Sequence, residues 1–208
     1  MRDMEINPEM SMAAYMTARL QGHFRDMYKG LPLVKMPEDL RTYQRVIEST
    51  KPDVIVELGT HRGGSAIWFA DQMHAILGQG RVVTVDTTYC DLSDGRVSFV
   101  HGDLRTVFSR VEALIGDGER VMVIDDSAHT LDVTLASLRA YSKLVTKGCM
   151  FVVEDTIVDT PFSIWPGVHG AGQAVEAFLA ENDRFQRAEG MRPYGVTMHM
   201  GGWLEAVS

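Results

Sequence analysis

Five short runs of apolar, mostly β-branched residues recur along the chain, and each is followed by a polar or glycine-rich turn. The runs are Val54–Val56, Val82–Val85, Val97–Val100, Val121–Ile124 and Met150–Val153. A continuous apolar run is typical of a strand whose two faces are both covered, as in a parallel sheet. The pattern therefore predicts five buried parallel strands.

Segments with helical three-and-four spacing lie between most of these runs, at 65–77, 104–115 and 131–145. This alternation predicts an α/β fold with a doubly wound sheet and right-handed crossovers. Two further helices are expected ahead of the first strand, and one more is expected after Pro161. The ranges of these three helices are 9–21, 38–48 and 172–182. Strand candidates near Phe185 and at 196–204 predict a C-terminal antiparallel hairpin at the sheet edge.

A chain of 208 residues with 45% apolar content is long enough for one well-buried domain. We expect residues 1–50 to be a helical lead-in to the domain formed by 51–208. The 28 acidic residues outnumber the 20 basic ones, and the net charge of −8 argues against a nucleic-acid partner. Two cysteines, no signal-peptide pattern and no span-length apolar run predict a cytoplasmic protein without a membrane segment.

Two of the predicted strands end in carboxylates, Asp125-Asp126 and Glu154-Asp155. If the strands are parallel neighbours, Asp126, Glu154 and Asp155 converge on one small volume, where they repel one another unless a cation lies between them. Their hard oxygen ligands favour Mg²⁺, with Mn²⁺ or Ca²⁺ as alternatives. The competing interpretation is that some of these acids cap helices or pair with Lys and Arg.

His129 follows Asp126 by three residues and begins the next predicted helix. A neutral imidazole at that distance from a metal suits a general base that removes a proton from a hydroxyl. The alternative is a capping or solvent-exposed histidine.

A glycine-rich turn, Glu57–Ser65, connects the first strand to its helix. Gly59, Gly63 and Gly64 would let a ligand approach the backbone near helix amide groups, although tight turn packing without a ligand explains them too. Asp86 ends the second strand, where a carboxylate can bind ribose hydroxyls of NAD or of an adenosyl donor. Asp103, after the third strand, either contacts an adenine amine or caps the helix expected from Leu104.

Several motifs together resemble the cephalosporin hydroxylase-like family, whose members are similar to metal-dependent S-adenosylmethionine O-methyltransferases of antibiotic and sugar tailoring. The matching segments are Val56–Ala66, Asp126–His129, Leu138–Tyr141, Val152–Ile157, Gln173–Phe178 and Gly201–Leu204. The similarity extends from about Pro52 to the end of the chain. The Asp-Ser-Ala-His string combined with the later Glu-Asp pair is its specific part.

The resemblance implies a Rossmann-like class I methyltransferase sheet, S-adenosylmethionine and Mg²⁺ as cofactors, and a small-molecule hydroxyl as acceptor, on a sugar or natural product. It implies that Asp126, rather than Asp125, joins Glu154 and Asp155 as metal ligand, with His129 as base. The residues expected at the cofactor are Glu57, Gly59, Gly63, Ser65, Asp86, Asp103 and Asp125. Asp125 could instead cap the following helix. We also expect a homo-oligomer.

Two other classes compete. A nicotinamide oxidoreductase could share the sheet and Asp86, but the glycine spacing is not GxGxxG and no Tyr-x-x-x-Lys pair occurs. A non-catalytic adenosyl-binding module could keep the fold alone. The combination of three carboxylates with His129 argues against such a module.

Overall fold

A seven-stranded sheet forms the centre of the protein, in the strand order β5-β4-β3-β6-β7-β9-β8. The computed structural model describes residues 9–161, 163, 165, 167–195 and 197–208. The strands are β3 Val54–Leu58, β4 Arg81–Asp86, β5 Val97–His101, β6 Val121–Asp125, β7 Met150–Val153, β8 Phe185–Arg187 and β9 Trp203–Ala206. The pairs among β3 to β7 are parallel, and β9 runs antiparallel to both β7 and β8. The predicted α/β class, its five parallel strands and its edge hairpin are therefore confirmed.

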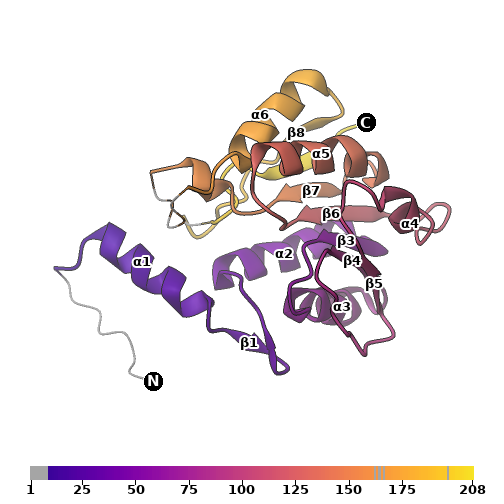
Figure 1. Cartoon of the computed structure of the whole chain (residues 1–208), viewed down its shortest axis with the longest axis horizontal. Coiled ribbons are helices and arrows are strands. Elements are labelled where there is room, and N and C mark those ends of the chain that lie inside the picture. Colours follow the sequence, from indigo (N-terminus) through magenta and orange to yellow (C-terminus); the bar gives the residue numbers. More distant parts are fainter. Residues whose placement is uncertain (1–8, 162, 164, 166, 196) are drawn as a thin grey trace.

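Helices cover both faces of this sheet (Figure 1). They are α1 Met12–His23, α2 Pro37–Thr50, α3 Gly64–Leu77, α4 Phe108–Glu112, α5 Leu131–Tyr141 and α6 Ala171–Glu181, with 3₁₀ turns η1 Ser142–Leu144 and η2 Thr156–Asp159. A short antiparallel hairpin joins α1 to α2, with two residues in each strand, β1 Met27–Tyr28 and β2 Leu31–Pro32. In Figure 1, α5 and α6 lie on one side of the sheet and α2 and α3 on the other.

Strand alternation divides the core into two layers. Val54 and Val56 of β3 pack with α5 and α6, whereas Ile55 between them packs with α2 and α3. The same alternation separates Val123 from Met122 in β6. Because successive side chains of a strand point to opposite faces, runs that are apolar throughout can fill both layers.

Two elements differ from their predicted ranges. The helix expected at 104–115 is reduced to α4, because the amides of Thr106 and Val107 bond the carbonyl of Asp103 in a turn. The last strand begins at Trp203, not near 196. Thr197 and Met198 use their polar groups to bind Asp39 of α2 instead of a sheet neighbour. Val196 lies outside the described residues.

Strand order reverses next to β3, because the chain proceeds from β3 outward to β4 and β5 and then returns to β6 on the other side. In open α/β sheets the crevice at such a reversal, beyond the carboxyl ends of the strands, is where ligands bind. The carboxyl ends of β3 and β6 are therefore the place to look for a site.

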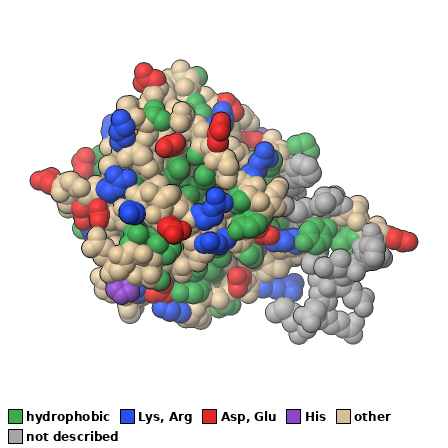
Figure 2. All heavy atoms as spheres, turned by 180° about the vertical axis from the view of Figure 1, so that it is seen from behind, with side chains coloured by type: hydrophobic (Ala, Val, Ile, Leu, Met, Phe, Trp, Pro, Cys, Tyr) green, Lys and Arg blue, Asp and Glu red, His purple; other side chains and the backbone are tan. Residues whose placement is uncertain are grey.

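Acidic and basic side chains lie interspersed on the face seen in Figure 2. Within the described residues, no helix combines the length and the apolar composition needed to cross a lipid bilayer.

Gly64, the first residue of α3, has no room for a side chain. A Cβ there would lie 1.9 Å from the carbonyl oxygen of Pro32 in β2. We therefore expect Gly64→Ala to lower the free energy of unfolding by about 1–3 kcal/mol, the usual cost of overpacking. Urea unfolding would measure it. The matched control is Gly22→Ala in α1, where a Cβ meets nothing within 4 Å. Equal stability of the two variants would contradict this packing.

Candidate active site

The sheet register places the acidic residues at the ends of β6 and β7 side by side. Asp125 pairs with Val153, so Asp126 and Glu154 follow at the same level of two adjacent parallel strands. Because successive side chains of a strand point to opposite faces of the sheet, Asp125 points toward α5. Its carboxylate accepts hydrogen bonds from the hydroxyls of Ser137 and Ser127 and from the Ser127 backbone N–H. Asp126 and Glu154 share the opposite face. Asp155 lies near each of them in a separate group of possible metal ligands, with Asp126 and His129 in one and with Glu154 and His199 in the other. Asp125 lies apart from both groups.

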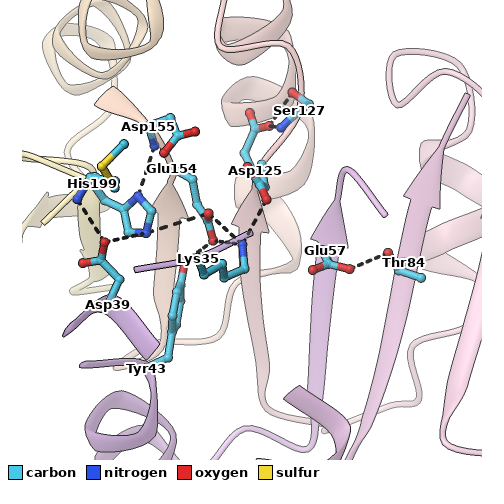
Figure 3. Close-up of polar contacts among 12 residues, drawn as sticks. Lys35, Asp39, Tyr43, Glu57, Thr84, Asp125, Ser127, Glu154, Asp155 and His199 are labelled. Carbon is cyan, nitrogen blue, oxygen red and sulfur yellow. Dashed lines mark hydrogen bonds and ion pairs between the residues drawn. The ribbon is translucent and has the colours of Figure 1, made fainter. Parts of the chain in front are cut away.

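A lysine that sequence reasoning missed lies between two of these carboxylates. The Nζ of Lys35 donates to Asp126 Oδ2 at 2.9 Å and to both oxygens of Glu154 at 2.7 Å. Figure 3 shows the Lys35 side chain extending to Glu154 at the end of its strand. Lys35 is only 3% exposed. The alternative in which some of the acids pair with a lysine thus applies to Asp126 and Glu154.

The charges around Lys35 change how these groups ionise. Burial opposes the charged form of Lys35, but the carboxylates of Asp126 and Glu154 outweigh it and raise the lysine pKa above its ordinary value. Burial also works against ionised Glu154, yet Lys35 and His199 bring the pKa of Glu154 below its usual range. At Asp155, burial and the charges of Asp126 and Glu154 outweigh the opposing effects of His199 and Lys35 and raise the pKa to about 8. Asp155 is therefore mostly protonated near neutral pH, and a nearby cation would favour its ionised form.

Helix α2 and the loop before β9 surround Glu154 with further polar groups. The Tyr43 hydroxyl donates to Glu154 Oε1 at 2.6 Å. The Nδ1 of His199 accepts the backbone N–H of Asp155 at 3.1 Å, so the proton of the neutral ring is on Nε2. That Nε2 lies 3.7 Å from Asp39 Oδ2 and 3.8 Å from Glu154 Oε2 (Figure 3). Asp39 in turn accepts the Thr197 hydroxyl and the Met198 N–H.

His129 faces two of the carboxylates. Its Nε2 lies 3.8 Å from Asp126 Oδ1 and 3.5 Å from Asp155 Oδ2. Ligand atoms of these three residues all lie within 4.8 Å of one another. His129 and Asp155 both have left-handed backbone conformations, with φ of 55° and 53°. Such strain in non-glycine residues collects at functional sites, and here it directs both side chains to one spot.

The glycine turn packs tightly within the chain. A Cβ on Gly59 would lie 2.0 Å from the Asp126 carbonyl oxygen, and one on Gly63 would lie 2.2 Å from the Leu92 side chain. Both glycines also have positive φ, 112° and 80°. Internal packing is thus sufficient to require them, and it holds the turn against the start of the carboxylate cluster.

The two acids predicted to follow β4 and β5 both bind backbone amides. Asp86 accepts the N–H of His61, in the glycine turn, and the N–H of Thr88. Asp103 accepts the N–H of Arg105 and pairs with its guanidinium. It does not cap a helix at Leu104, because no helix begins there.

Glu57 is fully buried at the end of β3 beside Ser65 and Thr84. Burial raises its pKa to about 7, and the charge of Lys35 and the hydroxyls of Ser65 and Thr84 offset only part of that rise. The Thr84 hydroxyl donates to Oε2, whereas Oε1 has no hydrogen-bond partner among the described residues. A buried carboxylate oxygen without a donor is an acceptor available to a ligand.

A cleft connects the glycine turn to the carboxylate cluster. It is lined by Pro32, Val34 and Lys35 from the segment before α2, by Gly59, Thr60, His61 and Ser65 from the turn, and by Asp126. Of the residues expected at the cofactor and the metal, Gly59, Ser65 and Asp126 line this cleft.

Sequence reasoning missed Lys35, Asp39 and His199 and assigned Tyr43 only to the apolar face of its helix. One signal was available for Lys35, since it is the only charged residue in the stretch Leu31–Pro37. A lone charge in an apolar stretch that becomes buried must find a partner.

The raised pKa of Glu57 predicts a pH effect on stability. Burial makes Glu57 harder to ionise in the fold than in the unfolded chain, so the fold is favoured while Glu57 is protonated. This contribution to stability is complete below about pH 4.5 and is lost as the pH rises to about 7. Glutamine cannot ionise, so over this pH range we expect the free energy of unfolding of Glu57→Gln to fall by roughly 3 kcal/mol less than that of wild type. Urea unfolding in chelator from pH 4.5 to 8 would measure it, with the exposed Glu48→Gln as control. Parallel pH curves for wild type and Glu57→Gln would count against the buried charge.

The family model described as Rhamnosyl O-methyltransferase/CmcI matches residues 22–207. The rhamnosyl O-methyltransferase of Mycobacterium tuberculosis is 29% identical over 188 residues, which cover 85% of this chain and 76% of that protein. That of Mycobacterium leprae is 26% identical, covering 85% and 81%.

Solved structures share the fold. A structure of CmcI with Mg and SAM superposes with a TM-score of 0.68 at 23% identity, covering 89% of this chain and 78% of that one. The O-methyltransferase TomG from Streptomyces achromogenes, in complex with SAM, gives a TM-score of 0.55 at 19% identity, covering 96% and 92%. The shared fold agrees with the expected α/β class.

Proposed function

The chain belongs to the Rhamnosyl O-methyltransferase/CmcI family, and we propose that it is an S-adenosylmethionine-dependent O-methyltransferase whose acceptor is a hydroxyl of a sugar or natural product. The observation that carries this proposal is the cleft between the glycine turn and a carboxylate cluster with an adjacent histidine. A role in antibiotic biosynthesis is the finer form of this proposal.

The cleft suits the donor. Glu57 offers the free Oε1 beside the cleft-lining Ser65, and Asp86 is held against the glycine turn by the His61 amide. Gly59 also lines the cleft, and Gly63 lies in the same turn. We assign Glu57, Gly59, Gly63, Ser65 and Asp86 to the donor. Asp103, placed after β5, is assigned to its adenine end, whereas the serine contacts of Asp125 favour a structural role.

The carboxylate cluster suits a divalent cation. Asp126, Glu154 and Asp155 offer three carboxyl groups, and Lys35 contacts only Asp126 and Glu154. Burial and the charge of Asp126 raise the pKa of Asp155, and a bound cation would lower that pKa and favour the carboxylate. We propose that Asp126, Glu154 and Asp155 hold Mg²⁺, with Mn²⁺ or Ca²⁺ as alternatives, because all three offer hard oxygen ligands.

Residues of the chain itself would transfer the proton and position the reacting groups. When bound, the donor supplies a sulfonium methyl and the cation supplies a Lewis acid that lowers the pKa of the acceptor hydroxyl. His129 takes the hydroxyl proton on Nε2, and the carboxylates of Asp126 and Asp155 orient the ring and stabilise the imidazolium that forms. His199 fixes the Asp155 backbone, which holds that carboxylate toward His129. Positioning is the main task of the protein in this scheme.

An apolar wall beside the cluster suits part of an acceptor. Leu20, Met36, Ile157 and Met198 form a small buried cluster against which Trp165 packs. Trp165 also meets the ring of Phe24 edge-on at 5.9 Å, and Phe24 is 43% exposed. We place the acceptor between the end of α1 and η2, next to Asp155.

The proposed activity is tested by S-adenosylhomocysteine release with a panel of rhamnosides and other hydroxylated natural products. We expect turnover with Mg²⁺, loss in excess EDTA and recovery on readdition of Mg²⁺. Asp126→Asn should lower kcat by about 10²-fold or more, because it removes a charge that acts in the transition state. The exposed Asp117→Asn should match wild type. Full activity of Asp126→Asn in EDTA would remove the cation from the mechanism.

The base is tested separately. We expect His129→Gln to lower kcat by about 10²- to 10⁴-fold, the range for a general base, while donor affinity stays within twofold of wild type. The variant's kcat should also lose the acidic limb of the wild-type pH profile. The exposed His74→Gln serves as the control. A pH profile of His129→Gln that keeps the wild-type acidic limb would assign the proton to another group.

A further inference from the structure

Lys35 places a positive charge between two of the proposed metal ligands. Its ammonium lies between Asp126 and Glu154, within 2.9 Å of the first and 2.7 Å of both oxygens of the second. The side chain is buried and comes from the segment between β2 and α2, far in sequence from both strands. A buried ammonium held by two carboxylates is a fixed unit charge inside the cluster.

Asp126 is shared between two sides of the cluster. Its Oδ2 accepts Lys35, whereas its Oδ1 faces His129 and, beyond it, Asp155 Oδ2. Both oxygens of Glu154 accept Lys35, and Oε1 also accepts the Tyr43 hydroxyl. A divalent ion bound by Asp126, Glu154 and Asp155 must therefore share two of its three ligands with Lys35.

We propose that Lys35 is an internal cation that competes with the divalent metal for Asp126 and Glu154. It holds these carboxylates together when no metal is bound, and it lowers metal affinity when one binds, so that the site stays assembled with or without the ion. The inference rests on the proposed metal-dependent function and identifies the residue that sets metal affinity.

The opposing interpretation makes Lys35 a structural brace. A brace keeps the ligands in place, so its removal would scatter them and weaken metal binding. A competitor repels the metal and occupies lone pairs, so its removal would strengthen metal binding. The two interpretations thus predict opposite signs for the same measurement.

The experiment is calorimetric titration of Mg²⁺ and of Mn²⁺ into chelator-stripped protein saturated with S-adenosylhomocysteine. Lys35→Met keeps the length of the apolar stem and removes the charge, and Lys35→Gln keeps one amide donor without charge. We expect both to bind the metals at least about tenfold more tightly than wild type, because a unit charge a few ångströms away is removed. The exposed Lys143→Met should bind as wild type does.

Thermal unfolding supplies a second readout in case Lys35→Met is unstable in chelator. We expect its Tm to fall below that of wild type without metal and to rise more than that of wild type as Mg²⁺ is added. If wild type binds metal and both Lys35→Met and Lys35→Gln bind it equally or more weakly, the proposal that Lys35 competes with the metal is overturned. The proposed metal-dependent function is then unaffected. Absence of metal binding in wild type and in both variants overturns the metal part of the proposed function, and the competition with it.

Discussion

The buried contact of Lys35 with Asp126 and Glu154 is the interaction on which the rest of the site depends. A lysine that is 3% exposed remains charged because two carboxylates meet it, and its charge offsets the repulsion between those carboxylates. The contact ties the segment before α2 to the ends of β6 and β7. The N-terminal lead-in is therefore a part of the site, since α2 adds Asp39 and Tyr43 around the same glutamate.

The sheet register determines where these charges lie. Parallel pairing of Asp125 with Val153 brings the next residue of each strand to the same height, and alternation separates Asp125 from Asp126. The left-handed backbone at Asp155, held through its N–H by His199, then turns a third carboxylate toward His129. Local strain and a buried hydrogen bond thus complete an arrangement that the strands begin.

Much of the fold could be predicted from the sequence because buried parallel strands leave a plain pattern of apolar runs and turns. The convergence of Asp126 with Glu154 followed from the same pattern, because strand ends meet at one edge of a sheet. Lys35 could not be paired in this way, since 91 and 119 residues separate it from its two partners. The role of His199 was missed for a related reason. The sequence predicted a strand in this stretch, whereas in the structure it is a loop in which Thr197 donates a hydrogen bond to Asp39.

The most direct test of the account is a crystal structure grown with Mn²⁺ and S-adenosylhomocysteine, with anomalous diffraction used to locate the metal. The account predicts an anomalous peak within bonding distance of the Asp126, Glu154 and Asp155 carboxylates. It also predicts S-adenosylhomocysteine in the cleft beside Gly59. S-adenosylhomocysteine bound there without a peak, or a peak away from this cluster, would contradict the central claim that the carboxylates form a metal site for methyl transfer.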